Sequence, residues 1–248
     1  MCTSGQHVGF VLKKRFLLLL APIFLLASAG PAFAIQAFHL VQHAQIAGTY
    51  DVYLTNFAFK AVNPKTGLTL YSRAPDWQLL ICNARRQVFT TMPPSQFTGR
   101  LARAIENFDT ERFDNLKWKV IGKGDVVGLP VTNARVQIKE SLFRVSDDPR
   151  RNNRLWTAEY SAFDQFKIPE AVCHALQRHY GLPIHHGIPV RCAYLDFNGE
   201  KTTALDTFKF NKVDVDMAYD QPANYKRVKG ELEVLANDNA SGLEFFRP

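Results

Sequence analysis

The stretch that most constrains the fold is residues 187–226, because it contains a hairpin turn between two strand-like runs. The Asn-Gly pair at positions 198–199 separates the runs, and both residue types tolerate the positive φ angles of a tight type I′ turn. In the second run Phe208 and Phe210 share one face, and past Lys212 the apolar residues fall on the other phase. A change of phase inside a strand indicates a β-bulge, since side chains alternate between the two faces. The sequence therefore predicts a long bent strand in a curved sheet.

The first 34 residues have the layout of a secretory signal peptide. Three basic residues at 13–15 precede an apolar run at 16–27, and residues 32–34 form the small-x-small pattern of a cleavage site. The apolar run is shorter than the about 20 residues that a membrane-spanning helix needs. We therefore expect residues 1–34 to be removed and the protein to be periplasmic or secreted, with a retained N-terminal anchor as the alternative. No cysteine stands at the end of the apolar run, so lipid attachment there is not expected.

The charge of the chain makes nucleic acid an unexpected partner. The formal net charge is +7, but three of the basic residues lie in the leader, which has no acidic residue. The cluster Arg150, Arg151 and Arg154 follows an Asp-Asp-Pro sequence and is interrupted by two asparagines, which is typical of a polar loop. We expect no nucleic-acid binding, whereas contact with an anionic membrane surface is compatible with this charge.

Three cysteines remain after the leader: Cys82, Cys173 and Cys192. An oxidising compartment allows one disulfide and one spare thiol. The preferred pair is Cys173 with Cys192, because that bond would tie a predicted helix to the neighbouring strand. Three buried free thiols are the alternative that the sequence leaves open.

Alternating apolar and polar residues predict a meander of short antiparallel strands. Tyr50, Val52 and Leu54 alternate with polar neighbours, as a half-buried strand requires. Turn residues such as those at 63–67 separate this run from the next ones. The other strand-like runs before the hairpin are residues 68–71, 77–82, 88–90, 116–121, 126–129, 134–138 and 155–160.

Two segments have helical periodicity and helix-like beginnings. Residues 93–107 begin with two prolines and place Phe97, Leu101 and Ile105 at every fourth position, which predicts a helix with its apolar stripe on the sheet. Residues 168–180 predict a second helix, with proline in its first turn and glycine directly after its end.

A further helix is expected near the mature N-terminus, where Phe38, Val41 and Ile46 form an apolar side. The predicted fold is therefore a single, mainly β (α+β) domain over residues 35–228. It contains one curved antiparallel sheet, or half-barrel, with two or three packing helices. Residues 229–248 are charged and then rich in small polar residues, which predicts a flexible C-terminal tail.

The order and spacing of several short motifs resemble a known family over residues 48–228. In chain order the motifs are Ala74-Pro75-Asp76-Trp77, Gly128-Leu129-Pro130, Ile168-Pro169-Glu170, Tyr180-Gly181-Leu182-Pro183, Gly187-Ile188-Pro189-Val190-Arg191 and Pro222-x-x-Tyr225-Lys226. In this arrangement the chain is similar to the LolA/LolB-like half-barrel proteins of bacterial envelopes.

The resemblance implies a curved antiparallel sheet wrapped around helices, with a concave apolar face that holds lipid-like groups. It implies a binding or carrier module whose partners are lipids or the acyl chains of lipoproteins. It names no ligand and transfers no binding residue by position. The missing lipid-attachment cysteine fits a soluble carrier better than an anchored receptor of the LolB type.

Aromatic residues on predicted strand faces are the candidates for a ligand-binding surface. The chain has 19 Phe, 8 Tyr and 3 Trp, and large apolar side chains on a concave sheet can line a lipid-sized cleft. The alternative is that the same side chains fill an ordinary core. The candidate ligand-binding residues are Phe57, Phe59, Phe97, Leu101, Phe208 and Phe210.

Histidines around the second predicted helix form the leading candidate metal site. His174 and His179 are five residues apart on a predicted helix and point in different directions. Only His179, His185 and His186 could converge, and zinc needs three or four such ligands. The alternative is a solvated helix end followed by polar loop histidines, and we expect no bound metal.

No motif predicts an enzyme or a cofactor. The chain lacks a nucleophile elbow, an H-E-x-x-H helix, a paired C-x-x-C and a dinucleotide fingerprint. Asp214 and Asp216 share one strand face, but they alternate with apolar residues and are typical of a solvent face. The leading hypothesis is an exported, non-enzymatic carrier of an apolar or amphiphilic ligand. The alternatives are an envelope interaction module without a small ligand and a metal-dependent hydrolase.

Overall fold

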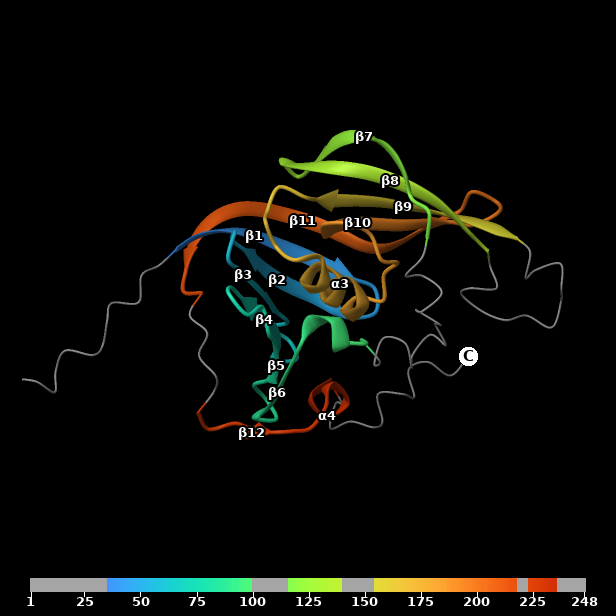
Figure 1. The fold of residues 1–248 in the computed structure, drawn as a ribbon. Helices are drawn as coiled ribbons and strands as arrows, with labels where there is room; N and C mark the ends of the chain where they lie inside the picture. Colours follow the sequence, from blue (N-terminus) through green and yellow to red (C-terminus); the bar gives the residue numbers. More distant parts are fainter. Residues whose placement is uncertain (1–34, 100–115, 140–153, 218–222, 236–248) are drawn as a thin grey trace, which may run out of the picture. The chain divides into compact units, whose positions relative to one another are not determined.

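The computed structural model describes residues 35–99, 116–139, 154–217 and 223–235. Within these residues twelve strands form one sheet, in the order β12-β6-β5-β4-β3-β2-β1-β11-β10-β9-β8-β7 (Figure 1). The strands are β1 (Ile35–Ala44), β2 (Gly48–Leu54), β3 (Ala58–Val62), β4 (Leu68–Arg73), β5 (Leu79–Asn83), β6 (Val88–Met92), β7 (Lys119–Val126), β8 (Leu129–Lys139), β9 (Leu155–Phe163), β10 (Ile188–Leu195), β11 (Lys201–Val215) and β12 (Lys226–Arg227). The helices are the 3₁₀ helix η1 (Pro94–Gln96), α3 (Glu170–His179) and α4 (Glu231–Leu235).

The sheet consists of two meanders that meet at β1. Strands β1–β6, here called the first half, pair with one another in chain order, and β7–β11, the second half, do the same. Strand β1 pairs antiparallel with both β2 and β11 and so joins the halves. The short β12 is parallel to β6. The end strands β12 and β7 do not pair with each other, so the curved sheet is open, and the predicted fold class is confirmed.

The prediction of a helix at residues 38–46 is wrong, because this segment is strand β1. Leu40, Gln42 and Ala44 alternate with more exposed neighbours and have no exposed surface. Backbone pairing with strands on both sides and burial of this face outweigh a helical spacing of three apolar residues.

Helix α3 confirms the predicted helix at residues 168–180. Proline precedes its first turn, and the amide of Leu182 donates to the carbonyl of Gln177 beyond its end. Of the helix expected at residues 93–107, the described part forms only the 3₁₀ helix η1, which ends before an extended Phe97, and residues 100–107 lie outside the described residues. The predicted leader also lies outside them. Part of the stretch predicted as a flexible tail forms α4, where Val234 and Leu235 are buried.

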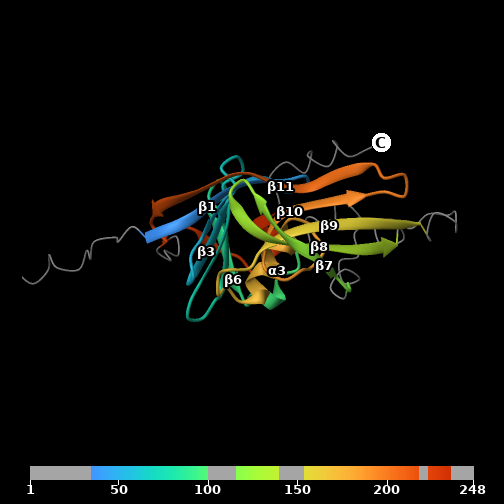
Figure 2. The same cartoon turned by 90° about the horizontal axis from the view of Figure 1, so that it is seen from above.

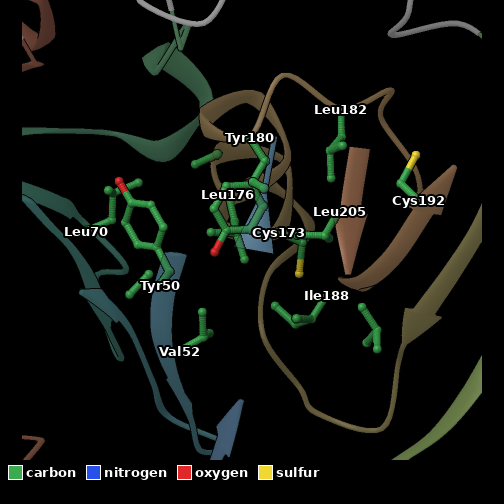
Figure 3. Close-up of a cluster of buried hydrophobic side chains, with 14 of the residues drawn as sticks. Tyr50, Val52, Leu70, Cys173, Leu176, Tyr180, Leu182, Ile188, Cys192 and Leu205 are labelled. Carbon is green, nitrogen blue, oxygen red and sulfur yellow. The ribbon is translucent and has the colours of Figure 1, made fainter. Parts of the chain in front are cut away.

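Helix α3 lies against one face of the sheet, which we call the inner face (Figure 1). Here both halves contribute to one continuous apolar core, because their inward side chains alternate with outward polar ones. Fully buried members from the first half, the helix and the second half meet in this core (Figure 3), including Tyr50, Val52, Leu70, Leu176, Tyr180, Ile188 and Leu205. A smaller cluster of Tyr71, Leu80, Cys82 and Phe89 packs against Tyr225.

Strand β11 contains the bulge that the sequence predicts, but at a different place. Consecutive residues of β1 pair with Lys209 and Thr207, which leaves Phe208 as the extra residue. The predicted bend is confirmed, whereas its predicted position past Lys212 is wrong.

The bulge separates the two phenylalanines that were expected to share a face. Phe210 stands opposite Leu40 and packs against the inner core. Phe208 is 55% exposed. An extra residue shifts the alternation by one position, so side chains two apart no longer point to the same side.

Candidate functional site

The six side chains predicted to line a ligand site do not share one surface. Phe59 and Phe97 are fully buried in the core. Phe57 lies in the turn before β3, with the Arg73 guanidinium 5.9 Å from its ring centroid. Leu101 lies outside the described residues, Phe208 is largely exposed at the bulge, and Phe210 joins a separate aromatic cluster.

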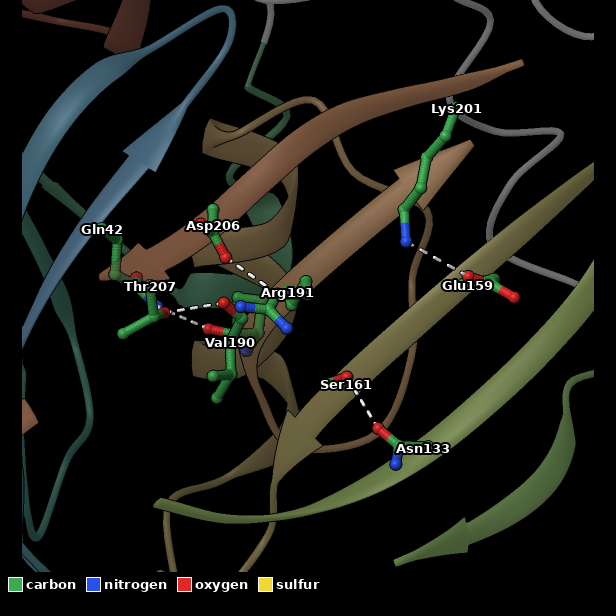
Figure 4. Close-up of polar contacts among 10 residues, drawn as sticks. Gln42, Asn133, Glu159, Ser161, Val190, Arg191, Lys201, Asp206 and Thr207 are labelled. Carbon is green, nitrogen blue, oxygen red and sulfur yellow. Dashed lines mark hydrogen bonds and ion pairs between the residues drawn. The ribbon is translucent and has the colours of Figure 1, made fainter. Parts of the chain in front are cut away.

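The inner face beneath α3 holds a buried polar network in addition to apolar side chains. The amide of Gln42 donates to the Pro189 carbonyl at 2.7 Å and to the Thr207 hydroxyl at 2.9 Å. The Thr207 hydroxyl donates to the Val190 carbonyl at 2.7 Å (Figure 4). The Tyr180 hydroxyl donates to Gln42 at 3.2 Å. These bonds join β1, β10 and β11 to the end of α3. Satisfied buried polar groups fix a single packing arrangement, so this region is a rigid support.

A second buried amide holds the segment after α3. Gln177 has no exposed surface and donates to the carbonyls of His185 and Gly187 at 2.7 and 2.9 Å. Its side-chain oxygen accepts from the His185 amide at 3.1 Å. Gly187 has a φ of +83°, and a Cβ there would stand 2.9 Å from the Phe163 carbonyl oxygen, so this position requires glycine.

Four phenylalanines form an aromatic cluster on the inner face. Phe38 of β1 lies 5.8, 5.0 and 5.2 Å, between ring centroids, from Phe163, Phe166 and Phe210. Phe163 and Phe166 lie 5.1 Å apart in an edge-to-face arrangement. Phe163 is buried, whereas the other three are only partly buried against the core. We call this set the four-Phe cluster.

The rim of the four-Phe cluster is cationic on one side and strained on another. The Lys212 ammonium lies 5.3 Å from the Phe38 ring centroid, within range of a cation–π interaction. The β7–β8 turn approaches Phe210, since a Cβ on Gly128 would stand 4.0 Å from that ring. Val127 in this turn has a φ of 50° and is 44% exposed. A β-branched residue in this conformation is rare and costs about 1–3 kcal/mol.

A small cleft adjoins the cluster. It has a volume of about 20 Å³, which is room for about one water molecule. Phe163 and Phe166 form one wall, and Cys173, Glu170 and His186 belong to the rest of the lining. A lipid-sized group does not fit inside this cleft, so the open rings of the cluster are the surface that could receive one.

The three histidines named as weak metal candidates do not converge. His179 is buried, its Nε2 lies 2.7 Å from the Tyr50 hydroxyl, and burial lowers its pKa to about 4. Burial also lowers the pKa of His185, whose Nδ1 bonds the His186 carbonyl at 2.8 Å. His186 instead bonds the Glu170 carboxylate at 2.7 Å on the surface. Within the described ranges no group of three or more His, Cys, Asp or Glu side chains could hold a metal ion.

The three cysteines are free and buried, so the preferred Cys173–Cys192 bond is not formed in this structure. Burial raises the pKa of each of these two thiols to about 12, and for Cys173 the nearby Glu170 adds to the effect. Both thiols therefore stay protonated at neutral pH and have little nucleophilic character.

Phe38, Phe163 and Phe166 were not predicted as site residues. Phe38 was assigned to a helix, although its alternation with Leu40 and Gln42 is a strand signal that could have identified its inner face. Phe163 and Phe166 come from the end of β9 and the segment after it. No sequence pattern links those positions to β1, because only the sheet order brings them together.

No protein-family model and no curated protein matches the chain. It is similar in part to solved structures, among them the Pseudomonas aeruginosa MucA/MucB complex, with 12% identity and a TM-score of 0.28 over 73% of this chain. The chain spans 53% of that matched chain.

Two further solved structures show a similar level of likeness. The Mycobacterium tuberculosis lipoprotein LppX is 13% identical with a TM-score of 0.28, over 72% of this chain and 87% of that one. A LolA superfamily protein from Nitrosomonas europaea is 14% identical with a TM-score of 0.25, over 75% and 89%. TM-scores this low carry no argument about function. The open, curved sheet with a helix on its inner face confirms the predicted fold class of a half-barrel.

Among the helices that the described residues form, none has the length and hydropathy of a membrane span.

Proposed function

We propose that the protein is an exported, non-enzymatic binding protein for an amphiphilic ligand, whose apolar part lies on the four-Phe cluster. One observation carries this proposal: Phe38 packs against both Phe166 and Phe210, and all three rings remain partly exposed on the inner face beside a cation. A core would bury such rings, whereas a binding surface leaves them accessible until the ligand covers them.

The chemistry of the cluster fits an acyl chain with an anionic head. Covering apolar surface contributes about 25 cal/mol per Å², so about 100 Å² of ring surface covered by an alkyl chain contributes about 2–3 kcal/mol. The Lys212 ammonium stands at the edge of this surface and can pair with a carboxylate or phosphate. The buried network beneath α3 keeps the surface in place, because it fixes β1 and β11, the strands that carry Phe38 and Phe210.

The test is a titration of the protein with a dansylated long-chain fatty acid, followed by fluorescence. Phe210→Ser removes a ring from the cluster and should weaken binding about tenfold, the equivalent of about 1.4 kcal/mol. Phe208→Ser is the matched control, since it changes the same residue type two positions away, at an exposed place outside the cluster. Equal affinities for the two variants would show that the cluster is not the site.

A second variant separates ligand contact from loss of folding. Lys212 is exposed, so Lys212→Gln leaves the core intact. It should weaken binding of the fatty acid about fivefold while leaving an uncharged long-chain alcohol unaffected. A loss for both probes would contradict the proposed role of the ammonium group.

An interaction module is the second candidate, and the edge strand β7 is the observation that favours it. Val120 and Ile121 are 62% and 51% exposed, and β7 is the last strand of the sheet that the described residues form. An exposed sheet edge can accept a further strand from another chain. A photo-crosslinker placed at Val120 would then capture a partner in cells, whereas one placed at exposed Thr202 would not.

A further inference from the structure

The end of the sheet opposite the four-Phe cluster presents a second exposed apolar feature. Strand β10 ends and β11 begins in a hairpin that extends away from α3 (Figure 2). At its turn Phe197 is 49% exposed. Lys201, next to this turn, and Phe210 are nine residues apart on β11. At the rise per residue of a β-strand, this corresponds to a distance of about 30 Å.

The turn holds Phe197 outward by several hydrogen bonds. The Asp196 carboxylate accepts from the amides of Asn198 and Glu200, each at 2.8 Å. The Asp196 amide donates to the Glu200 carbonyl at 3.0 Å and closes the loop. Gly199 takes a φ of +82° in this turn. These bonds fix the backbone of the turn, and the Phe197 ring in it stays largely exposed.

Strand β9 adds a second apolar residue and a cation beside Phe197. Leu195 pairs with Thr157, so β9 begins next to the end of β10. Leu155, the first residue of β9, is 48% exposed. The Arg154 guanidinium lies 4.0 Å from the centroid of the Phe197 ring. We call Arg154, Leu155 and Phe197 the hairpin tip.

Further basic residues flank the hairpin tip. Lys139 pairs with Leu155 across the β8–β9 ladder, and Lys201 starts β11. Of the acidic groups at this end, Asp196 bonds the turn amides, Glu159 pairs with Arg135 and with Lys201 (Figure 4), and Glu200 is exposed in the turn.

We propose that the hairpin tip is a membrane-docking element, which inserts Phe197 and Leu155 among the head groups of an anionic bilayer. An apolar tip that projects from a fold does not enclose a small molecule, because ligand sites are concave. A planar surface accepts such a tip, and aromatic residues are favoured at the level of the head groups. Arg154 and Lys139 add attraction to anionic lipids.

The test is co-sedimentation with vesicles of phosphatidylglycerol and phosphatidylcholine, compared with vesicles of phosphatidylcholine alone. The protein used is Ala34–Pro248, which is one compact unit that contains every described strand. We expect binding to the mixed vesicles and at least fivefold weaker binding to the neutral ones, from the loss of charge attraction.

Three variants then assign the effect to the tip. Phe197→Ser should reduce partitioning onto anionic vesicles about tenfold, because an inserted ring is lost. Phe208→Ser is the matched control, because it makes the same substitution at a phenylalanine of similar exposure that lies on β11, away from the hairpin tip. It should bind the vesicles like the wild type. Arg154→Gln should weaken binding to anionic vesicles alone, by about fivefold.

The outcomes separate this proposal from the ligand site. Equal losses of vesicle binding in Phe197→Ser and Phe208→Ser would overturn membrane docking. Absence of wild-type binding to anionic vesicles would overturn it as well and would leave a protein partner as the occupant of the hairpin tip. Loss of vesicle binding by Phe210→Ser alone would also overturn it and would assign the lipid contact to the four-Phe cluster. Fatty-acid affinity that is unchanged in Phe197→Ser is expected, since the two sites lie at opposite ends of β11.

Discussion

The two halves of the sheet use the same strand architecture for different purposes. In the first half, β1–β6, large apolar side chains are buried against α3, η1 and α4, and none of the largely exposed ones identified in the described residues lies there. The second half, β7–β11, exposes six of them: Val120, Ile121, Val127, Leu155, Phe197 and Phe208. The difference indicates that both halves share one core, while the second half supplies most of the exposed apolar surface available for recognition.

A pair of identical substitutions tests this division most strongly. Leu70 on β4 is fully buried, so Leu70→Ala should lower the free energy of unfolding by about 3 kcal/mol through lost contacts and a cavity. Leu155→Ala on β9 removes the same atoms from a side chain that is 48% exposed and should change stability by less than about 0.5 kcal/mol. Denaturant unfolding measures both. Similar losses of unfolding free energy in the two variants would contradict the difference assigned to the two halves.

Acid should destabilise the protein through His179 of α3, which bonds Tyr50 of the first half. Its pKa is about 4 in the folded protein and about 6.5 when unfolded, so the unfolded state binds a proton first as the pH falls. The contribution is zero well above pH 6.5 and grows on acidification, reaching about 2 kcal/mol of lost stability by pH 5.

The variant His179→Gln keeps a hydrogen-bonding group near Tyr50 and removes the titration. Unfolding free energies at pH 7.5 and pH 5 should therefore differ less in this variant than in the wild type, by about 2 kcal/mol. The same pH dependence in both proteins would mean that other groups cause the acid sensitivity.

A smaller effect should follow from the network at the junction of the halves. Thr207→Val keeps the shape of the side chain but removes the bonds to Gln42 and the Val190 carbonyl. We expect a loss of about 1–2 kcal/mol, because buried polar groups lose a partner. Hydrogen exchange of the β1 and β10 amides should also become faster. Unchanged exchange would mean that this network does not stabilise the junction of the two halves.

The smallest effect is expected at the bulge. Phe208 is the extra residue of β11 and its ring is more than half exposed, so Phe208→Ser should alter the unfolding free energy by less than about 0.5 kcal/mol. A loss above 2 kcal/mol would indicate that this ring is packed in solution.

Local patterns were sufficient to predict much of the fold. Alternation at Tyr50, Val52 and Leu54 identified β2, and the proline start and glycine stop around residues 168–181 identified α3. The Asn-Gly pair correctly placed the β10–β11 hairpin, but the tight type I′ turn expected there is wrong, because residues 196–200 connect the strands and only Gly199 of the pair has a positive φ. These signals lie within a few residues of one another, so the sequence contains them directly.

The features that sequence analysis missed depend on distant partners. Strand β1 has a helix-like apolar spacing, and only pairing with β2 and β11 makes it a strand. The position of the bulge depends on the register between β1 and β11, which local alternation does not determine. The four-Phe cluster draws on β1, β9, β11 and the segment after β9, so the candidate list recovered Phe210 alone.

Native mass spectrometry of the gently purified protein tests the central claim most directly, followed by solvent extraction and lipid analysis. Wild-type protein should carry a stoichiometric adduct in the mass range of a lipid, which is lost on denaturation. Phe208→Ser should retain this adduct and Phe210→Ser should lose most of it, because only the second ring belongs to the four-Phe cluster. A bare polypeptide mass in the wild type, or an adduct retained equally by both variants, would contradict ligand binding at the four-Phe cluster.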